Sequence, residues 1–144
     1  MDVGFTGTRR GMTEVQWNVL RAWWATYSIP CVFHGGDCIG ADDQAYHLAL
    51  DKGWRTIGHI PTKDHARAFC SYDQERASRN YLARNRDIVD QSGILYATPK
   101  EMTEQPRGGT WYTINYARKQ GKPIVIIWPD GSVSEENRAK SESK

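Results

Sequence analysis

The stretch ATPKEMTEQPRGGTWYTINYARKQGKPIVIIWP, residues 97–129, decides the expected fold. It begins within one apolar run, residues 93–99, and ends with a second, residues 123–129. Such uninterrupted runs are typical of parallel strands that are covered on both faces. Between them a polar loop leads to RGGT and a helical segment. The start of a helix directly after a strand is a common place for a bound anion, so the stretch predicts a parallel α/β sheet with an anion site at its edge.

The same succession of strand, turn and helix runs through the chain. Apolar runs and helical spacing predict, in order, strand 2–7, helix 13–27, strand 30–36, helix 41–53, strand 54–61, loop 62–75, helix 76–93, strand 94–99, helix 110–121 and strand 123–129. We therefore expect an α/β, Rossmann-like, doubly wound parallel sheet of about five strands in the order 3-2-1-4-5, flanked by helices. Residues 1–130 should form this domain, and residues 131–144, with almost nothing to bury, a polar C-terminal tail.

Composition limits the classes of protein that the chain can represent. A length of 144 residues suits one domain, and a net charge of +2 is too small to indicate non-specific nucleic-acid binding. No apolar run approaches the roughly 20 residues of a membrane span, and the strand-like start does not resemble a signal peptide. Cys31, Cys38 and Cys70 lack metal-ligand spacing. They predict reduced thiols in a cytoplasmic protein, with no metal site and no cofactor.

Three loops are expected to meet where the strand order reverses, beyond the carboxyl ends of the strands, which is where such sheets bind ligands. They are residues 7–11, 34–43 and 98–110. The outer two combine glycines with arginines, and their candidate ligand residues are Gly7, Thr8, Arg9, Arg10, Arg107, Gly108, Gly109 and Thr110. Backbone N–H groups at helix starts, together with guanidinium groups, favour a phosphate or pyrophosphate. The alternative is that both turns are plain helix caps, with Thr110 as an ordinary N-cap residue.

The middle loop contributes two glycines and several carboxylates. Gly35 and Gly36 permit close backbone approach, and Asp37 and Asp42 are candidates to accept hydrogen bonds from ribose hydroxyls. The alternative is that the acidic residues complement the dipole of the following helix, which is the interpretation we prefer for Asp43.

Ring side chains near these loops have two interpretations each. Trp111 and Tyr112 are candidates to stack on a base, but at most one of them is expected to face the ligand, because helical aromatics more often belong to the core. His34 is either a ligand contact or a histidine whose hydrogen bonds are satisfied at a strand end.

Four blocks of the sequence resemble the SLOG superfamily, the Rossmann-like group that includes the LOG-type nucleotide phosphoribohydrolases and the DNA-processing protein DprA. The blocks are GFTGTRRGMT, HGGDCIGADDQA, YLARNRDIVDQSGILYATP and RGGTWYTINYA, and the similarity covers about residues 3–129. The chain is most similar to small stand-alone members from bacteria and phages. The resemblance implies a pocket for a nucleotide or a nucleotide-derived signal such as an ADP-ribose derivative or a cyclic nucleotide, and a role in phage defence conflict.

The catalytic motif of the LOG-type enzymes is only partly matched. Arg84 aligns with the arginine of their Arg-Lys pair, while Asn85 stands in place of the lysine. Gly109 and Thr110 match their Gly-Thr, but no Asp or Glu occurs from residue 111 to 122, where those enzymes carry a catalytic glutamate. The resemblance therefore implies a retained phosphate site and a lost catalytic acid.

Three functions follow, in order of preference. The first is a binding protein, a sensor or sequestering module for a nucleotide-derived small molecule. The second is a LOG-type N-glycosidic hydrolase whose acid has moved to another loop, with Asp37, Asp42 and Arg84 as catalytic candidates and Asp87 as a further acid. The third is DprA-like nucleic-acid binding, which the nearly balanced charge disfavours.

The first helix also predicts self-association. Its apolar side chains span a wider arc than one sheet face needs, namely Val15, Val19, Leu20, Trp23, Trp24 and Tyr27, with Trp17 and Ala22 beside them. We expect a homo-oligomer, a dimer at least, with this helix in the contact and no membrane partner. The alternative is that the loop at 62–76 covers Trp23 or Trp24 within one chain.

Overall fold

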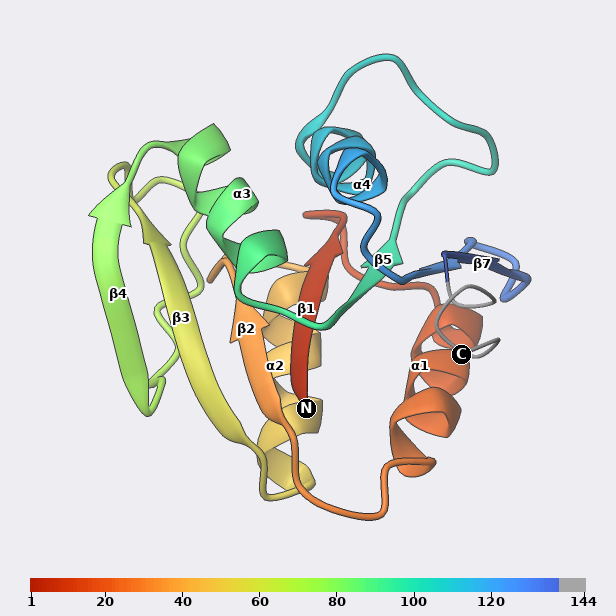
Figure 1. Cartoon of the computed structure of the whole chain (residues 1–144), viewed down its shortest axis with the longest axis horizontal. Coiled ribbons are helices and arrows are strands. Elements are labelled where there is room, and N and C mark those ends of the chain that lie inside the picture. The colour runs from red at the N-terminus through yellow and green to blue at the C-terminus, as the bar shows by residue number, and fades with distance from the viewer. Residues whose placement is uncertain (138–144) are drawn as a thin grey trace.

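The computed structural model describes residues 1–137, which form one mostly parallel sheet flanked by helices (Figure 1). Its elements, in chain order, are β1 (Asp2–Gly7), α1 (Glu14–Ala25), β2 (Val32–Gly35), α2 (Ala41–Asp51), β3 (Arg55–Pro61), β4 (Gln74–Arg79), α3 (Tyr81–Asp90), β5 (Ile94–Thr98), α4 (Gly109–Lys119), β6 (Ile124–Ile127) and β7 (Val133–Glu136). None of the helices within this part of the chain is long and apolar enough to cross a membrane.

The strand order is β4-β3-β2-β1-β5-β6-β7, and only β7 runs antiparallel to its neighbour. The five strands expected from the apolar runs occupy the expected order, so the doubly wound α/β fold class is confirmed. The order reverses between β1 and β5, whose last residues, Gly7 and Thr98, are paired in register. Loops that follow these two strands therefore start side by side.

Within residues 1–137, seven strands replace the expected five, because two edge strands carry no apolar pattern. All six residues of β4 are exposed, and this strand is held by its backbone pairing with β3. The prediction of a loop up to residue 75 and a helix from residue 76 is therefore wrong for residues 74–79. Residues 133–136 of the expected tail pair with β6 as β7, while residues 138–144 lie outside the described part.

The helices cover both faces of the sheet. α1 and α2 pack with one set of alternating strand residues, which includes Phe5, Phe33 and Tyr96, and α3 and α4 pack with the other, which includes Leu95 and Ala97. In Figure 1, α2 lies behind β1 and β2, whereas α3 lies in front of the sheet. The carboxyl ends of the parallel strands and the long loop before α4 lie together at the top of that view.

Trp24 lies at the centre of the α1–α2 side of the core. It is fully buried, and its ring packs 4.9 Å from Trp54 and 6.4 Å from Phe5, measured between ring centroids. Core aromatics therefore cover Trp24, and Cys70 and Tyr72 of the loop at 62–76 pack against the same cluster. Trp23 is half-buried and packs edge-on against Tyr96 at 6.3 Å.

Candidate functional site

A cavity of about 390 Å³ opens where β1 and β5 end and α4 begins, and we call it the β1–α4 cavity. Nine residues predicted from the outer two loops and the start of the helix line it: Gly7, Thr8, Arg9, Arg10, Arg107, Gly108, Gly109, Thr110 and Trp111. The convergence follows from the fold, since the two loops leave adjacent strands at the same edge of the sheet. Tyr81, Lys100 and Glu101 complete the lining.

The β1–α4 cavity concentrates positive charge. Four basic side chains line it, Arg9, Arg10, Lys100 and Arg107, and none of them has an ion-pair partner within residues 1–137. Its one carboxylate, Glu101, accepts a hydrogen bond from Nε1 of Trp111 at 3.1 Å. Positive charges that converge on a concave site raise the local concentration of anions.

The start of α4 adds backbone hydrogen-bond donors to the β1–α4 cavity. Its N-cap is Gly108, at φ 115° and ψ 150°, and no side chain caps the helix. An uncapped helix leaves N–H groups of its first turn without intrahelical partners, and such groups bind anions. Thr110 is therefore not the N-cap residue, since it lies inside the first turn. The left-handed conformation of Gly108 is one that a side chain would strain.

The loop after β1 leads to a capped helix, which corrects the expectation of a second open helix start. Thr13 and Gln16 form a capping box that occupies the first turn of α1. Several N–H groups of the loop are also occupied: that of Thr8 donates to the carbonyl of Thr98, that of Gly11 to the carbonyl of Thr8, and that of Arg10 to Oγ1 of Thr8. The guanidinium groups of Arg9 and Arg10 are thus the main donors that this loop offers to a ligand.

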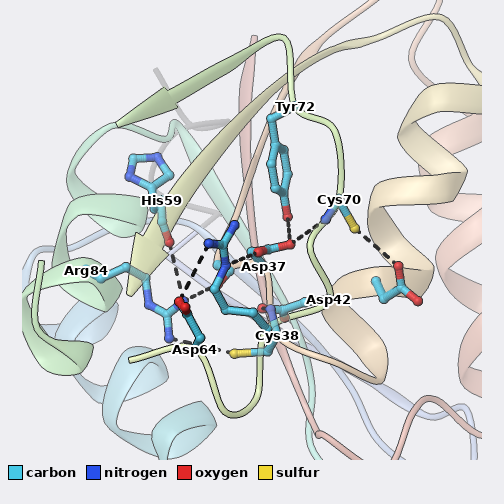
Figure 2. Close-up of polar contacts among 11 residues, drawn as sticks. Asp37, Cys38, Asp42, His59, Asp64, Cys70, Tyr72 and Arg84 are labelled. Carbon is cyan, nitrogen blue, oxygen red and sulfur yellow. Dashed lines mark hydrogen bonds and ion pairs between the residues drawn. The ribbon is translucent and has the colours of Figure 1, made fainter. Parts of the chain in front are cut away.

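Asp37 ties a distant segment to the end of β2. Its carboxylate accepts hydrogen bonds from Nε of Arg67 at 2.7 Å, the N–H of Cys70 at 3.0 Å and the hydroxyl of Tyr72 at 3.3 Å (Figure 2). It is fully buried in a left-handed conformation, φ 59°. Because Asp37 lines neither of the two cavities described here, its geometry supports a structural role for the carboxylate rather than a ribose contact.

Asp42 is a buried carboxyl group close to Arg84. Burial raises its pKa to about 6, against the opposing effects of the Arg84 charge and the N–H of Cys38, which donates to Oδ2 at 3.2 Å. Asp42 also lines neither cavity. A Cβ added to Gly36 would lie 2.5 Å from Nη1 of Arg84, so the close approach that this glycine permits is to a side chain of the protein.

Arg84 is 2% exposed and lies in a second cavity of about 390 Å³, between the end of β3 and the start of α3, which we call the β3–α3 cavity. Its Nη1 donates to the carbonyls of Gly36 and, at 3.4 Å, His59, and its Nη2 donates to Sγ of Cys38 at 3.7 Å (Figure 2). Its Nε has no hydrogen-bond partner. In the described chain, no carboxylate lies within ion-pair distance of this buried charge.

Tyr81 joins the two cavities, and sequence reasoning missed it. It lines both, as does Arg9. The guanidinium carbons of Arg9 and Arg84 lie 5.6 and 4.8 Å from the centroid of its ring. Tyr81 and Leu82 share an apolar helical spacing with Ile88 and Val89, which predicts that they belong to the core, but they are 37% and 45% exposed, whereas Ile88 and Val89 are buried.

The other ring side chains belong to the core or to internal networks. Trp111 is buried with its ring centroid 5.7 Å from that of Trp128, so only part of it borders the cavity, and the hydroxyl of Tyr112 accepts from Arg86. His34 bonds His59 and Asp2, both at 2.9 Å, and is a satisfied histidine. Within residues 1–137, no group of three or more potential ligands could hold a metal ion, and all three cysteines are free.

By sequence the chain matches no protein-family profile and no curated protein at a significant level. Its structure does match solved ones. They include the molybdenum cofactor binding protein of Rippkaea orientalis, at 22% identity and a TM-score of 0.67 over 88% of this chain and 76% of that one. The Moco carrier protein of Chlamydomonas reinhardtii matches at 23% and 0.55 over 87% and 74%, and DNA processing protein A of Helicobacter pylori at 17% and 0.60 over 99% and 72%.

The chain shares the Rossmann-like fold of these proteins. The resemblance inferred from the four sequence blocks is thereby confirmed at the level of the fold. Identities this low establish the fold alone, and function depends on the site that the fold carries. In this chain, the residues for that argument are those of the β1–α4 and β3–α3 cavities.

Proposed function

We propose that this protein binds a phosphate-bearing, nucleotide-derived small molecule in the β1–α4 cavity and holds it without cleaving it, as a sensor or sequestering protein. One observation carries the proposal: four basic side chains without ion-pair partners in the described chain share this cavity with the uncapped start of α4. A phosphate group supplies both the charge and the multiple acceptor oxygens that such a site requires.

Calorimetry on arginine variants tests the site. Arg107→Ala or Arg10→Ala is expected to weaken binding of a phosphate-bearing ligand by roughly 1.5–3 kcal/mol, the range for hydrogen bonds to charged groups. Arg55→Ala is the matched control, because Arg55 is an exposed arginine at the amino end of β3, opposite the cavities. Equal affinity in the wild type and both cavity variants would show that the arginines hold no ligand.

The ligand itself can be identified without a prior choice. The purified protein is incubated with cell extract, washed and denatured, and the released compound is identified by mass spectrometry. Direct binding assays should include AMP, ADP-ribose, a cyclic dinucleotide, the molybdenum cofactor that the two cofactor-binding relatives bind, and single-stranded DNA, which the Helicobacter pylori protein binds. A role in phage defence conflict would gain support from a ligand that is itself a defence signal.

The second candidate is hydrolysis of an N-glycosidic bond. Asp42 is the observation that favours it, because a carboxyl group with a pKa near 6 beside a buried arginine has the properties of a catalytic acid. Against it, α4 offers no acidic residue in its first turn, and Asp42 borders neither cavity. Incubation with excess AMP or ADP-ribose distinguishes the two: we expect intact ligand, whereas multiple turnovers that Asp42→Asn abolishes would establish the hydrolase.

A further inference from the structure

We infer that the two cavities form one elongated site, in which the β1–α4 cavity takes the phosphate and the β3–α3 cavity takes a planar heteroaromatic ring. The inference rests on the proposed function and names the ligand class more narrowly: a nucleotide-sized phosphate ester whose ring is bound, rather than a sugar phosphate or a free phosphate.

The closeness of the cavities is the first argument. Tyr81 and Arg9 line both of them, so the two cavities lie on either side of the same two side chains. Each holds about 390 Å³, and together they fall within the 300–1,000 Å³ that small-molecule sites commonly occupy. A ligand that extends past Tyr81 would contact both.

The chemistry of the two linings differs in the way that such a ligand requires. The β1–α4 cavity is cationic and presents mostly polar surface. Arg9, Lys63 and Arg84 also line the β3–α3 cavity, but most of its surface is apolar, with walls that include Pro61, Ala66, Leu82 and the ring of Tyr81. Leu82 and Tyr81 are partly exposed although they are large and apolar. Exposed apolar side chains that border a cavity mark a surface that a ligand covers.

Arg84 supplies a polar group to the β3–α3 cavity. Its guanidinium group is buried and charged, and its Nε is an unpartnered donor. Buried donors in native proteins are nearly always paired, so an orphaned one in a cavity wall points to an absent acceptor. A ring nitrogen or a ring carbonyl meets that need while its flat face packs against apolar walls, which an aliphatic chain cannot do.

The test compares ligands with and without a ring, using inorganic phosphate, ribose 5-phosphate and the four common 5′-mononucleotides. We expect at least one mononucleotide to bind the wild type about tenfold or more tighter than ribose 5-phosphate, as for one base stacked on an aromatic side chain. Leu82→Trp, which fills the β3–α3 cavity from an exposed position, should remove this advantage and leave ribose 5-phosphate unchanged. Arg107→Ala should weaken both ligands equally.

Controls separate the possible failures. Leu50→Trp, the same substitution at an exposed position of α2 away from both cavities, should retain the preference for the mononucleotide, and circular dichroism must show that each variant folds. If ribose 5-phosphate binds as tightly as every mononucleotide, or if Leu82→Trp weakens both ligands alike, the inference is overturned while the proposed function stands. If the wild type binds none of the phosphate compounds and none is released from extract, the proposed function itself is overturned.

Discussion

Arg84 carries a buried positive charge, and in the described chain no carboxylate lies within ion-pair distance of it. Removing this charge from water costs free energy, which other interactions of the fold must offset. Backbone carbonyls and the ring of Tyr81 compensate for part of the lost hydration. Such a charge is typical of a functional site, because folding alone would favour an apolar side chain of the same size.

Arg84→Met is therefore expected to leave the free energy of unfolding unchanged or to raise it by up to ~4 kcal/mol, while ligand affinity falls. Urea denaturation and calorimetry measure the two effects. Arg118→Met is the matched control, since Arg118 pairs with Glu104 and Glu136 and should lose stability when its charge is removed. A large loss of stability in Arg84→Met would show that the guanidinium group is structural.

Asp42 should make stability fall as the pH rises. Burial raises the pKa of this carboxyl group from 3.8 to about 6, so between these values the folded state holds a proton that the unfolded chain releases. The free energy of unfolding therefore decreases from about pH 4 to pH 6, and Asp42→Asn should remove this decrease. Urea midpoints of the two proteins from pH 4 to 7.5 provide the measurement, and parallel curves would contradict the raised pKa.

The buried histidines should have the opposite effect on the free energy of unfolding, which they should lower as the pH falls. Burial lowers the pKa of His59 from 6.5 to about 3, with the neighbouring His34 adding to the effect, and burial also lowers the pKa of His34. Below pH 6.5 the unfolded chain gains protons that the folded state refuses, so stability falls as the pH falls. His59→Asn should be less sensitive to acid than the wild type. Since the Asp42 effect opposes this one, only differences between variants separate them.

At the scale of elements, the carboxylate of Asp37 is one of the groups that hold the segment between β3 and β4. Asp37 binds Arg67, Cys70 and Tyr72 of this segment, and the segment supplies Ala66 and its neighbours to the β3–α3 cavity. Asp37→Asn keeps the size of the side chain and tolerates the left-handed backbone, but it breaks the buried ion pair.

We expect trypsin to cleave Asp37→Asn faster after Arg67, because the segment opens more often. Asp64→Asn is the control: Asp64 contacts the same arginine at 3.7 Å, but its side chain is 70% exposed, and an exposed pair contributes little. Equal cleavage of the two variants would show that Asp37 does not hold the segment. A binding assay on Asp37→Asn then tests whether the wall of the cavity depends on this anchor.

At the scale of the whole molecule, self-association through α1 stays a prediction. Leu20 and Trp24 face the core, while Val15 is 47% exposed and Trp17 and Trp23 are half-buried. Exposed apolar surface of this kind is common at interfaces between subunits. We propose a homodimer at least, with α1 in the contact.

Light scattering at micromolar concentration should give at least the mass of a dimer, and Val15→Glu should reduce it to that of a monomer. Because Trp23 packs on Tyr96, the more exposed Val15 is a better position for the charge. Leu50→Glu is the control, as Leu50 is equally apolar and 45% exposed but lies at the end of α2. A monomeric wild type would refute the dimer. Ligand affinity should fall in Val15→Glu only if the site is shared between subunits.

The sequence by itself determined the central strands, their order and the place of the β1–α4 cavity. Strands buried on both faces must be apolar throughout, and parallel connections must alternate with helices, so both features are written in the local pattern. The loops after residues 7 and 98 then converge because adjacent parallel strands end at one edge. Strands β4 and β7 left no such pattern, since their stability comes from backbone pairing rather than from buried side chains.

Only the tertiary structure decided which side chains of the expected site face a cavity. Asp37 and Asp42 stand in the loop that the sequence selected, yet Asp37 binds a segment about thirty residues away and Asp42 is buried near Arg84. Tyr81 appeared to belong to an apolar helix face, but the end of α3 carries it to the junction of two cavities. The direction of a side chain depends on what packs against it from distant parts of the chain, and local periodicity carries no record of those contacts.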